Sequence, residues 1–284
     1  MVSILRKVVL SPESFLWEVF APDVAQAAQP GQFLMVRLHE KGERIPLTVA
    51  DFNRKLGTVT LVVKVAGKTT EEMASYPEGG TFSDLIGPLG CPTVIERKGH
   101  VVLVGGGIGL APIFPILRGF HECGTRTTTI LGFKNVAQIF WQERFAALTD
   151  DLVLVTEDGS TPIKGTVIDA LRGVLSNGSS ADEVLAIGPV GMMQAVAELT
   201  RPLEIKTIVS MNPVMVDGIG MCGACRVTVG GKVLFACVDG PDMDAHQVDF
   251  ASFKIRQGRF LKEEQEALSR YKQECALKKQ GHIL

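Results

Sequence analysis

The hydrophobic positions of this chain follow two different patterns. In the first third of the sequence they form short β-branched and aromatic runs bounded by glycine, proline and asparagine, a pattern typical of a small antiparallel barrel or sandwich. We therefore predict a β-barrel domain over 1–98, which the turn-rich stretch 75–92 closes. The apolar runs span 14–22, 31–40, 46–52 and 57–67.

The pattern changes at His100. From there, strand-like apolar runs alternate with runs of helical periodicity, which predicts a doubly wound parallel sheet over 99–210. The uncharged stretch 101–117 contains four glycines and two prolines, which indicate a buried strand, a turn and a helix start rather than a membrane span. The predicted strands span 100–106, 125–133, 151–159, 183–189 and 206–213, and the predicted helices span 111–124, 137–149, 165–176 and 191–202.

The last quarter of the chain is predicted to form a small module over 211–252 and a helical tail over 253–284. A glycine pair at 230–231 predicts a hairpin turn in the module, and the charged stretch 261–279 predicts a helix. One apolar stripe runs along this helix, and it either packs on the protein's own surface or contacts another subunit. The stripe consists of Leu261, Leu268, Tyr271 and Cys275.

Composition narrows the function classes. The 284 residues suffice for two or three domains, and a formal net charge of −2 gives no reason to expect binding to nucleic acid or an anionic membrane. The N-terminus has no secretory signal pattern, and six cysteines in such a chain do not indicate a disulfide framework. We therefore expect a cytoplasmic protein.

Three cysteines have the spacing of metal ligands. Cys222, Cys225 and Cys237 form C-x2-C-x11-C in a glycine-rich segment, whereas a [2Fe–2S] cluster or a tetrahedral zinc site needs four protein ligands. Asp217 stands five residues before Cys222, where plant-type [2Fe–2S] proteins have their first cysteine. We predict a [2Fe–2S] cluster held by Asp217 and the three cysteines. A zinc site completed by His246 is the alternative.

Two glycine loops are candidates for nucleotide binding. The loop with Gly106, Gly107 and Gly109 follows a buried strand and opens a helix, where a pyrophosphate can approach the backbone and free N–H groups. The loop Gly188–Met193 follows another strand, so both loops would meet at the carboxyl ends of the sheet. A tight structural turn is the alternative.

Other polar residues could complete such a site. Glu157 and Asp158 follow a third strand, where they either reach a ribose hydroxyl or lie in a solvated turn. In the barrel, Arg44 precedes a strand-like segment, and 63–70 offers lysines, threonines and backbone amides before a helix start. This combination suits a diphosphate, although the same residue types are common on barrel strands.

Together these motifs resemble the ferredoxin–NADP reductase superfamily over essentially the whole chain. Within it, the chain is similar to dihydroorotate dehydrogenase electron-transfer subunits, and most similar to the small subunits of NADH-dependent reduced-ferredoxin:NADP oxidoreductases, also described as sulfide dehydrogenases. Asp217 favours the latter group, whose small subunits have one aspartate plus three cysteines. The resemblance lies in RIPLT (44–48), GKTT (67–70), GPLG (87–90), GGGIGLAP (105–112), TEDGS (156–160), GPVGMM (188–193) and, most specifically, the cysteine segment up to residue 250.

The resemblance implies FAD on the barrel, NAD(H) on the α/β domain and a [2Fe–2S] cluster on the C-terminal module. Three positions depart from the usual pattern: Thr69 replaces a glycine, Ile187 replaces a cysteine, and Lys134 ends a strand without an acid, which keeps NADP(H) as an alternative nucleotide. The implied FAD contacts are Arg44, Pro46, Leu47, Thr48, Val63, Lys64, Gly67, Thr69 and Thr70. The implied nicotinamide nucleotide contacts are Gly106, Gly107, Gly109, Ala111, Pro112, Glu157, Asp158, Gly188, Pro189 and Met192.

The resemblance further implies an oxidoreductase subunit that passes electrons between NAD(H), FAD and the cluster, without a catalytic side chain. It also implies a larger glutamate-synthase-like partner subunit with FAD and [4Fe–4S] clusters, which works with NADP(H) and ferredoxin in an electron-bifurcating heterodimer. The alternatives are an electron-transfer subunit for dihydroorotate oxidation and a non-catalytic electron carrier that binds no pyridine nucleotide.

Overall fold

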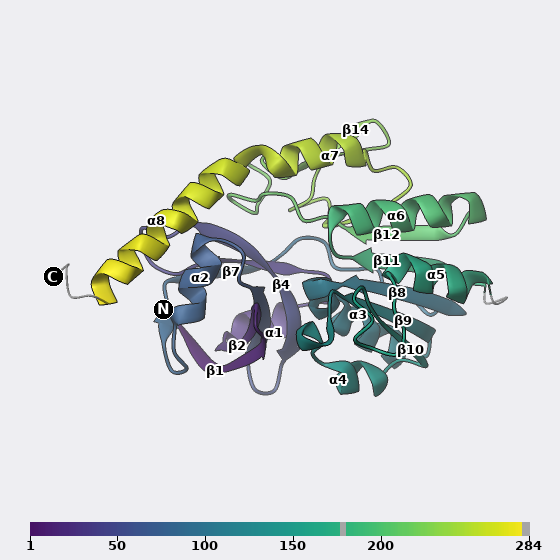
Figure 1. The fold of residues 1–284 in the computed structure, drawn as a ribbon, viewed down its shortest axis with the longest axis horizontal. Helices are drawn as coiled ribbons and strands as arrows, with labels where there is room; N and C mark the ends of the chain where they lie inside the picture. Colours follow the sequence, from purple (N-terminus) through teal and green to yellow (C-terminus); the bar gives the residue numbers. More distant parts are fainter. Residues whose placement is uncertain (177–179, 280–284) are drawn as a thin grey trace.

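The computed structural model describes residues 1–176 and 180–279. An antiparallel barrel and a parallel α/β sheet lie side by side, and the C-terminal part of the chain passes over both (Figure 1). The predicted fold class, a barrel followed by a doubly wound sheet and a small C-terminal module, is confirmed.

Seven antiparallel strands form the barrel, in the order β6-β1-β2-β5-β4-β3-β7. Ser83 alone separates the edge strands β6 and β7 along the chain, so the two ends of the sheet meet and the barrel is nearly closed. Trp17, Leu61 and Phe82 are large buried side chains of its core. The strands are β1 (Val2–Ser11), β2 (Ser14–Phe20), β3 (Phe33–Arg37), β4 (Arg44–Asn53), β5 (Thr58–Lys64), β6 (Thr81–Phe82) and β7 (Asp84–Leu89), and the helices are α1 (Pro22–Ala27) and α2 (Lys68–Ser75).

Strand β1 lies outside the runs that the hydrophobic pattern predicted as strands. Its register against β2 shifts between Ile4 and Arg6 and again between Val9 and Ser11. These irregularities break the two-residue alternation of buried and exposed positions, so the strand has no clear period in the sequence.

The second sheet has the strand order β10-β9-β8-β11-β12-β15. Its first five strands are parallel, with β8 in the middle, as in a doubly wound fold. The strands are β8 (His100–Gly106), β9 (Arg126–Phe133), β10 (Asp151–Thr156), β11 (Glu183–Ile187) and β12 (Lys206–Ser210). The helices are α3 (Leu110–Glu122), α4 (Gln142–Ala146), α5 (Val167–Ser176) and α6 (Val190–Thr200), with 3-10 turns η1 (Gly107–Gly109), η2 (Val136–Gln138) and η3 (Arg201–Leu203).

The predicted continuous helix over 137–149 is wrong. The chain forms the turn η2, passes through Trp141 in a left-handed conformation (φ 60°) and then forms the short helix α4. The Trp141 ring packs against Phe114 and Phe140, with ring centroids 5.4 and 5.6 Å apart. A straight helix would not bring these neighbouring aromatic side chains into one cluster, so tertiary packing overrides the local helical pattern.

The C-terminal module begins with a hairpin of β13 (Arg226–Val229) and β14 (Lys232–Phe235). The predicted turn at Gly230–Gly231 is confirmed, and both glycines have positive φ. Strand β15 (Asp242–Asp244) then leaves the hairpin and pairs antiparallel with β12 at the edge of the second sheet. Helix α7 (Phe250–Gln257) begins three residues before the predicted helical tail, after Asp249, whose side chain accepts a hydrogen bond from Ser252 N. The division of the chain into four segments stays a prediction.

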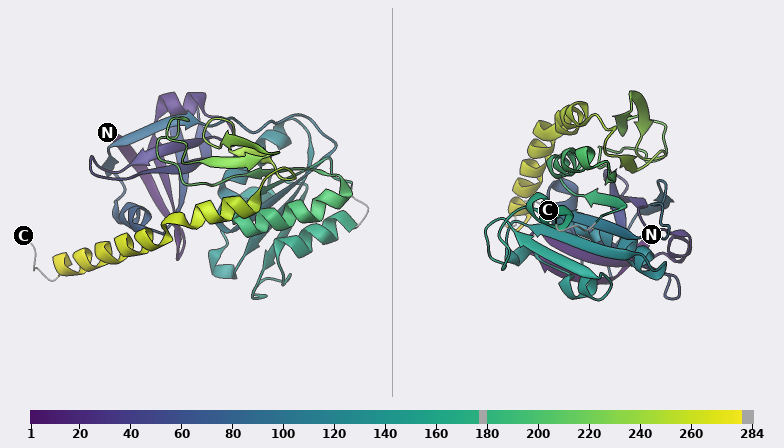
Figure 2. Two further views of the ribbon diagram at one scale, coloured as in Figure 1. Left: turned by 90° about the horizontal axis from the view of Figure 1, so that it is seen from above. Right: turned by 90° about the vertical axis from the view of Figure 1, so that its right-hand side faces the viewer.

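Helix α8 (Leu261–Lys279) follows the turn η4 (Gly258–Phe260) and runs from the module back over the barrel to α2 (Figures 1 and 2). Lys272 Nζ lies 3.9 Å from Glu71 of α2. Burial and the neighbouring Cys275 raise the pKa of Tyr271 to about 12, whereas Leu261 is exposed. Most of the predicted stripe therefore packs on the protein's own surface. No helix in the described ranges is long and apolar enough to cross a membrane.

A carboxylate cluster joins the barrel to the α/β domain. Asp51 of β4 accepts hydrogen bonds from Arg118 of α3 at 2.5 Å and from Arg144 of α4 at 2.6 Å. The Arg118 guanidinium also lies 4.9 Å from the ring centroid of Phe52. Because Asp51 is mostly buried, these contacts hold the two domains in a fixed relation at the base of the cleft between them.

Candidate functional site

One cavity of about 710 Å³ lies between the barrel and the carboxyl ends of the parallel strands. Most predicted FAD and nucleotide contacts from both domains line this same space. They are Pro46, Leu47, Thr48 and Lys64 from the barrel, and Gly106, Gly107, Gly109, Ala111, Pro112, Glu157, Gly188, Pro189 and Met192 from the α/β domain.

The remaining predicted contacts lie outside the cavity. Val63 points into the barrel core, and Arg44 is exposed at the start of β4. The Thr69 hydroxyl donates a hydrogen bond to Glu43, while Thr70 Oγ1 accepts hydrogen bonds from the N–H groups of Ala66 and Gly67 at 2.9 and 3.0 Å. These two threonines therefore order the start of α2.

Asp158 also lies outside the cavity. Its carboxylate accepts hydrogen bonds from the hydroxyl and N–H of Ser160 at 2.6 and 2.9 Å, and these contacts lower its pKa. Of the two predicted acids, Glu157 alone lines the cavity. The position of Glu157 is fixed by its backbone N–H, which donates to Phe133 O at 3.0 Å.

The two glycine loops touch each other, which explains why they need glycine. A Cβ on Gly109 would lie 2.2 Å from the carbonyl oxygen of Ile187 in the second loop, and one on Gly106 would lie 2.4 Å from the Met192 sulfur. The first helix turn after Gly109 thereby starts directly at the cavity wall. Backbone N–H groups at such a helix start can bind a phosphate.

Some cavity residues were not predicted as contacts. Gln138, Thr166 and Asn212 line the cavity. Gln138 ends the turn η2, Thr166 directly precedes α5, and Asn212 lies two residues after β12. Thr166 Oγ1 also bonds Asp169 Oδ2 at 2.7 Å, a capping pair that the T-x-x-D spacing before α5 could have indicated.

The predicted cluster ligands form two pairs. Cys225 Sγ lies 3.2 Å from Cys237 Sγ, and both cysteines are buried. Asp217 accepts hydrogen bonds from the N–H groups of Ile219 and Cys222, while the Cys222 side chain is exposed. The bond from Ile219 contributes most to lowering the pKa of Asp217, whereas burial beside Cys225 raises the pKa of Cys237 to about 12.

The side-chain contact of His246 lies elsewhere, which argues against the zinc alternative. His246 Nε2 lies 3.0 Å from Thr200 Oγ1 of α6, because β15 directs the chain away from the cysteines. Within residues 1–176 and 180–279, no group of three or more His, Cys, Asp or Glu side chains is placed to hold one metal ion. Two separate pairs suit a two-iron cluster, in which each iron takes two protein ligands.

The cysteine loop packs directly on the barrel. A Cβ on Gly218, next to Asp217, would lie 2.7 Å from the Met35 side chain of β3. Met35 is paired in register with Pro46 of β4, which lines the cavity. The loop is also tied to the end of the barrel by Cys91 N, which donates to Gly240 O at 2.6 Å. One pair of strands therefore separates the cavity from the cysteine segment.

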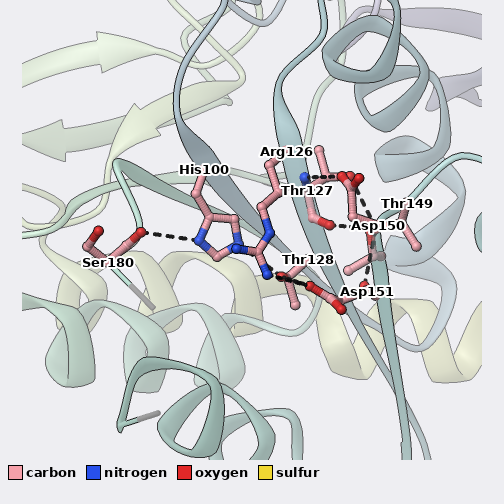
Figure 3. Close-up of polar contacts among 9 residues, drawn as sticks. His100, Arg126, Thr127, Thr128, Thr149, Asp150, Asp151 and Ser180 are labelled. Atoms are coloured by element: carbon pink, nitrogen blue, oxygen red, sulfur yellow. Dashed lines mark hydrogen bonds and ion pairs between the residues drawn. The ribbon is translucent and has the colours of Figure 1, made fainter. Parts of the chain in front are cut away.

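A second polar cluster lies at the opposite edge of the parallel sheet, where β8, β9 and β10 begin (Figure 3). His100 Nδ1 lies 3.2 Å from Ser180 O, and its Nε2 lies 2.9 Å from Thr128 Oγ1. Arg126 forms an ion pair with Asp151 at 3.1 Å. These contacts join the strand starts to one another, far along each strand from the cavity, and have a structural role.

A barrel and a doubly wound sheet that share one cavity, with a cysteine module packed on the barrel, define a ferredoxin-reductase-like protein. Residues 212–249 match the family described as the iron-sulfur cluster binding domain of dihydroorotate dehydrogenase B. A chain of the NADH-dependent reduced ferredoxin-NADP oxidoreductase superposes with a TM-score of 0.91 at 41% identity, covering 95% of this chain and 98% of that chain.

Two relatives extend the match along the sequence. The dihydroorotate dehydrogenase B (NAD(+)) electron transfer subunit homolog of Thermotoga maritima is 43% identical over 268 residues, 94% of each chain. The electron transfer subunit of Bacillus caldolyticus is 32% identical over 236 residues, 79% of this chain and 88% of its own. The chain belongs to the family of dihydroorotate dehydrogenase B electron-transfer subunits and their homologues. The predicted superfamily, oxidoreductase class and iron–sulfur domain are confirmed by these matches.

Proposed function

We propose that this chain passes electrons between NAD(H), FAD and a [2Fe–2S] cluster as one subunit of an electron-bifurcating oxidoreductase. The shared cavity carries the proposal, because Pro46, Leu47 and Thr48 of β4 face the same space as both glycine loops. A flavin on β4 and a nicotinamide on the loops would meet there. When bound, FAD can exchange a hydride with the nicotinamide and single electrons with the cluster.

The residues around the cavity bind and orient these groups. The N–H groups of the first turn of α2, with Lys64 nearby, suit the diphosphate of FAD. The loop of Gly106 to Gly109 and the start of α3 suit the diphosphate of the nicotinamide nucleotide, and Glu157 suits a ribose hydroxyl. The apolar walls of the cavity, including Ile108, Ile187 and Met192, keep water from the space between the rings.

In this proposal the cluster is held by the two ligand pairs, Asp217 with Cys222 and Cys225 with Cys237. Three sulfur donors and one carboxylate oxygen fit iron, which accepts both ligand types. The packing of Gly218 against Met35 supports a short route from the flavin on β4 to the cluster. Six free cysteines in the described chain also fit the predicted cytoplasmic location.

Electrons that reach the cluster must pass to a second protein. The family resemblance implies a larger glutamate-synthase-like partner with FAD and [4Fe–4S] clusters, through which ferredoxin and NADP(H) are reached. The match to a chain of the NADH-dependent reduced ferredoxin-NADP oxidoreductase, whose structure addresses flavin-based electron bifurcation, supports this proposal. Dihydroorotate oxidation is the second candidate, because the Bacillus caldolyticus relative serves dihydroorotate dehydrogenase B. The polypeptide that copurifies with the chain distinguishes the two.

Anaerobic titration of the purified complex with NADH tests the proposal. We expect NADH to bleach the flavin absorbance and then produce the EPR signal of a reduced [2Fe–2S] cluster, whereas NADPH acts mainly through the partner subunit. A flavin in this subunit that dithionite reduces but NADH does not would favour the non-catalytic electron carrier.

Asp217→Cys tests the fourth ligand. A carboxylate oxygen donates less electron density to iron than a thiolate, so we expect the variant cluster to have a lower reduction potential by at least 59 mV, a tenfold change for one electron. Because backbone N–H groups lower the pKa of Asp217, the wild-type potential should be flat between about pH 6 and 8. Identical EPR spectra and potentials in both proteins would contradict ligation by Asp217.

A further inference from the structure

Three arginines surround the cysteine loop and have no part in the function proposed above. Arg226 begins β13 directly after Cys225, whereas Arg256 lies in α7 and Arg259 in the turn η4. All three line a cavity of about 240 Å³ together with Cys222. The side chains therefore converge from two separate elements on the loop that holds two predicted ligands.

Two nitrogens of the Arg256 guanidinium differ in their hydrogen bonding. Its Nη2 donates to Ala224 O at 3.0 Å, in the loop between Cys222 and Cys225. Its Nε–H is buried and has no acceptor among the described residues. Buried donors without an acceptor are rare in folded proteins and indicate a missing partner group. The sulfur atoms of an iron–sulfur cluster accept such hydrogen bonds.

The positive charge around the loop is not neutralised by carboxylates. Arg226 Nη1 lies 3.0 Å from the position that a Cβ on Gly223 would take. Burial, together with the guanidinium groups of Arg226 and Arg259, lowers the pKa of Arg256. Within the described parts of the chain, none of the three arginines forms an ion pair.

We infer that Arg256, assisted by Arg226 and Arg259, orders the Cys222–Cys225 loop and raises the reduction potential of the cluster. The inference rests on the proposed function, since it concerns the same cluster. Reduction takes up one electron and so adds one negative charge, which three nearby guanidinium groups stabilise. Net charge and hydrogen bonds to sulfur both set the potential of such clusters. The arginines therefore favour electron flow from the flavin to the cluster.

The test compares redox titrations of the complex, followed by the EPR signal of the reduced cluster, for wild type and arginine variants. Arg256→Met removes the charge and every guanidinium N–H donor, and we expect it to lower the potential by about 59 mV, a tenfold change in the one-electron equilibrium. Arg256→Lys keeps the charge and should shift the potential less. Arg6→Met, on strand β1 of the barrel, removes an exposed charge outside the module and should shift nothing.

Equal potentials in wild type and Arg256→Met, at equal cluster content, would overturn the inference. If Arg256→Met does not assemble a cluster, Arg256→Lys and the exposed-site variant Arg259→Met decide: lowered potentials in both support it, and unchanged potentials in both overturn it. A wild-type protein without any cluster signal would instead contradict the proposed function. A purely structural role of Arg256 in the loop would change cluster content but not potential.

Discussion

Replacing Cys237 by alanine should remove the [2Fe–2S] cluster and leave the flavin in place. Cys237 Sγ lies 3.2 Å from Cys225 Sγ in the core of the module. Cys91 Sγ donates to the neighbouring Val238 O at 3.1 Å, so Cys91 is replaced by alanine in the same protein to prevent it from substituting as a ligand. The β4 side chains that we propose to contact the flavin line the cavity between the two domains, and Cys237 does not line it. We expect iron and sulfide content to fall to background, while NADH still bleaches the flavin and no electron reaches the partner.

A matched control for this variant is Cys123→Ala. Cys123 is a half-buried thiol at the end of α3, whose Sγ donates to Phe120 O at 3.2 Å, and it is not a predicted ligand. Its cluster content and electron transfer should equal those of wild type. A Cys237→Ala protein with a full complement of iron and an unchanged EPR signal would show that the cluster, if present, is held by other residues.

The Gly109→Ala variant should lose most of its reaction with NADH while keeping its FAD. The added Cβ would lie 2.2 Å from the Ile187 carbonyl oxygen, which belongs to backbone and cannot rotate away. The two glycine loops must therefore separate, and misplacing a bound group by about 1 Å can reduce a rate by roughly 100-fold. Stopped-flow measurement of flavin bleaching by NADH, with dithionite reduction as the reference, checks this expectation.

Gly173→Ala provides the corresponding control. Gly173 lies within α5, where a Cβ would meet no atom within 4 Å, so alanine should stabilise the helix by roughly 0.5–1 kcal/mol without changing the rate. If Gly109→Ala reacts with NADH as fast as this control, the nucleotide does not bind at the meeting point of the two loops.

The iron–sulfur segment could be predicted from the sequence because its predicted ligands lie close together along the chain, and residues 212–249 match an iron–sulfur cluster binding domain. Asp217, Cys222, Cys225 and Cys237 keep a fixed register along the chain, and the hairpin turn between them is encoded locally by two glycines. The position of His246 needed the structure, because its contact with Thr200 depends on the pairing of β15 with a strand of another domain.

The cavity was only partly predictable. Its glycine loops follow recognisable strands. They could be predicted to line a site because ligands bind at the carboxyl ends of the strands in a parallel sheet. Thr166 and Asn212 follow other strands of the same sheet and carry no motif of their own, and their convergence on one space is a property of the tertiary fold. The same applies to the turn at Trp141, which aromatic packing imposes on a helical pattern.

Strand β15 limits how this reductase can be re-engineered. Grafting the cluster-bearing segment onto another flavoprotein is an obvious route to a new redox chain, but excising 211–252 would also remove the edge strand of the nucleotide sheet. The protein from which the segment was removed would have unpaired backbone groups along β12, a surface prone to intermolecular strand pairing. The graft, in turn, would carry a strand with no sheet to join. A portable version therefore needs β12 as well, or a redesigned edge for both halves.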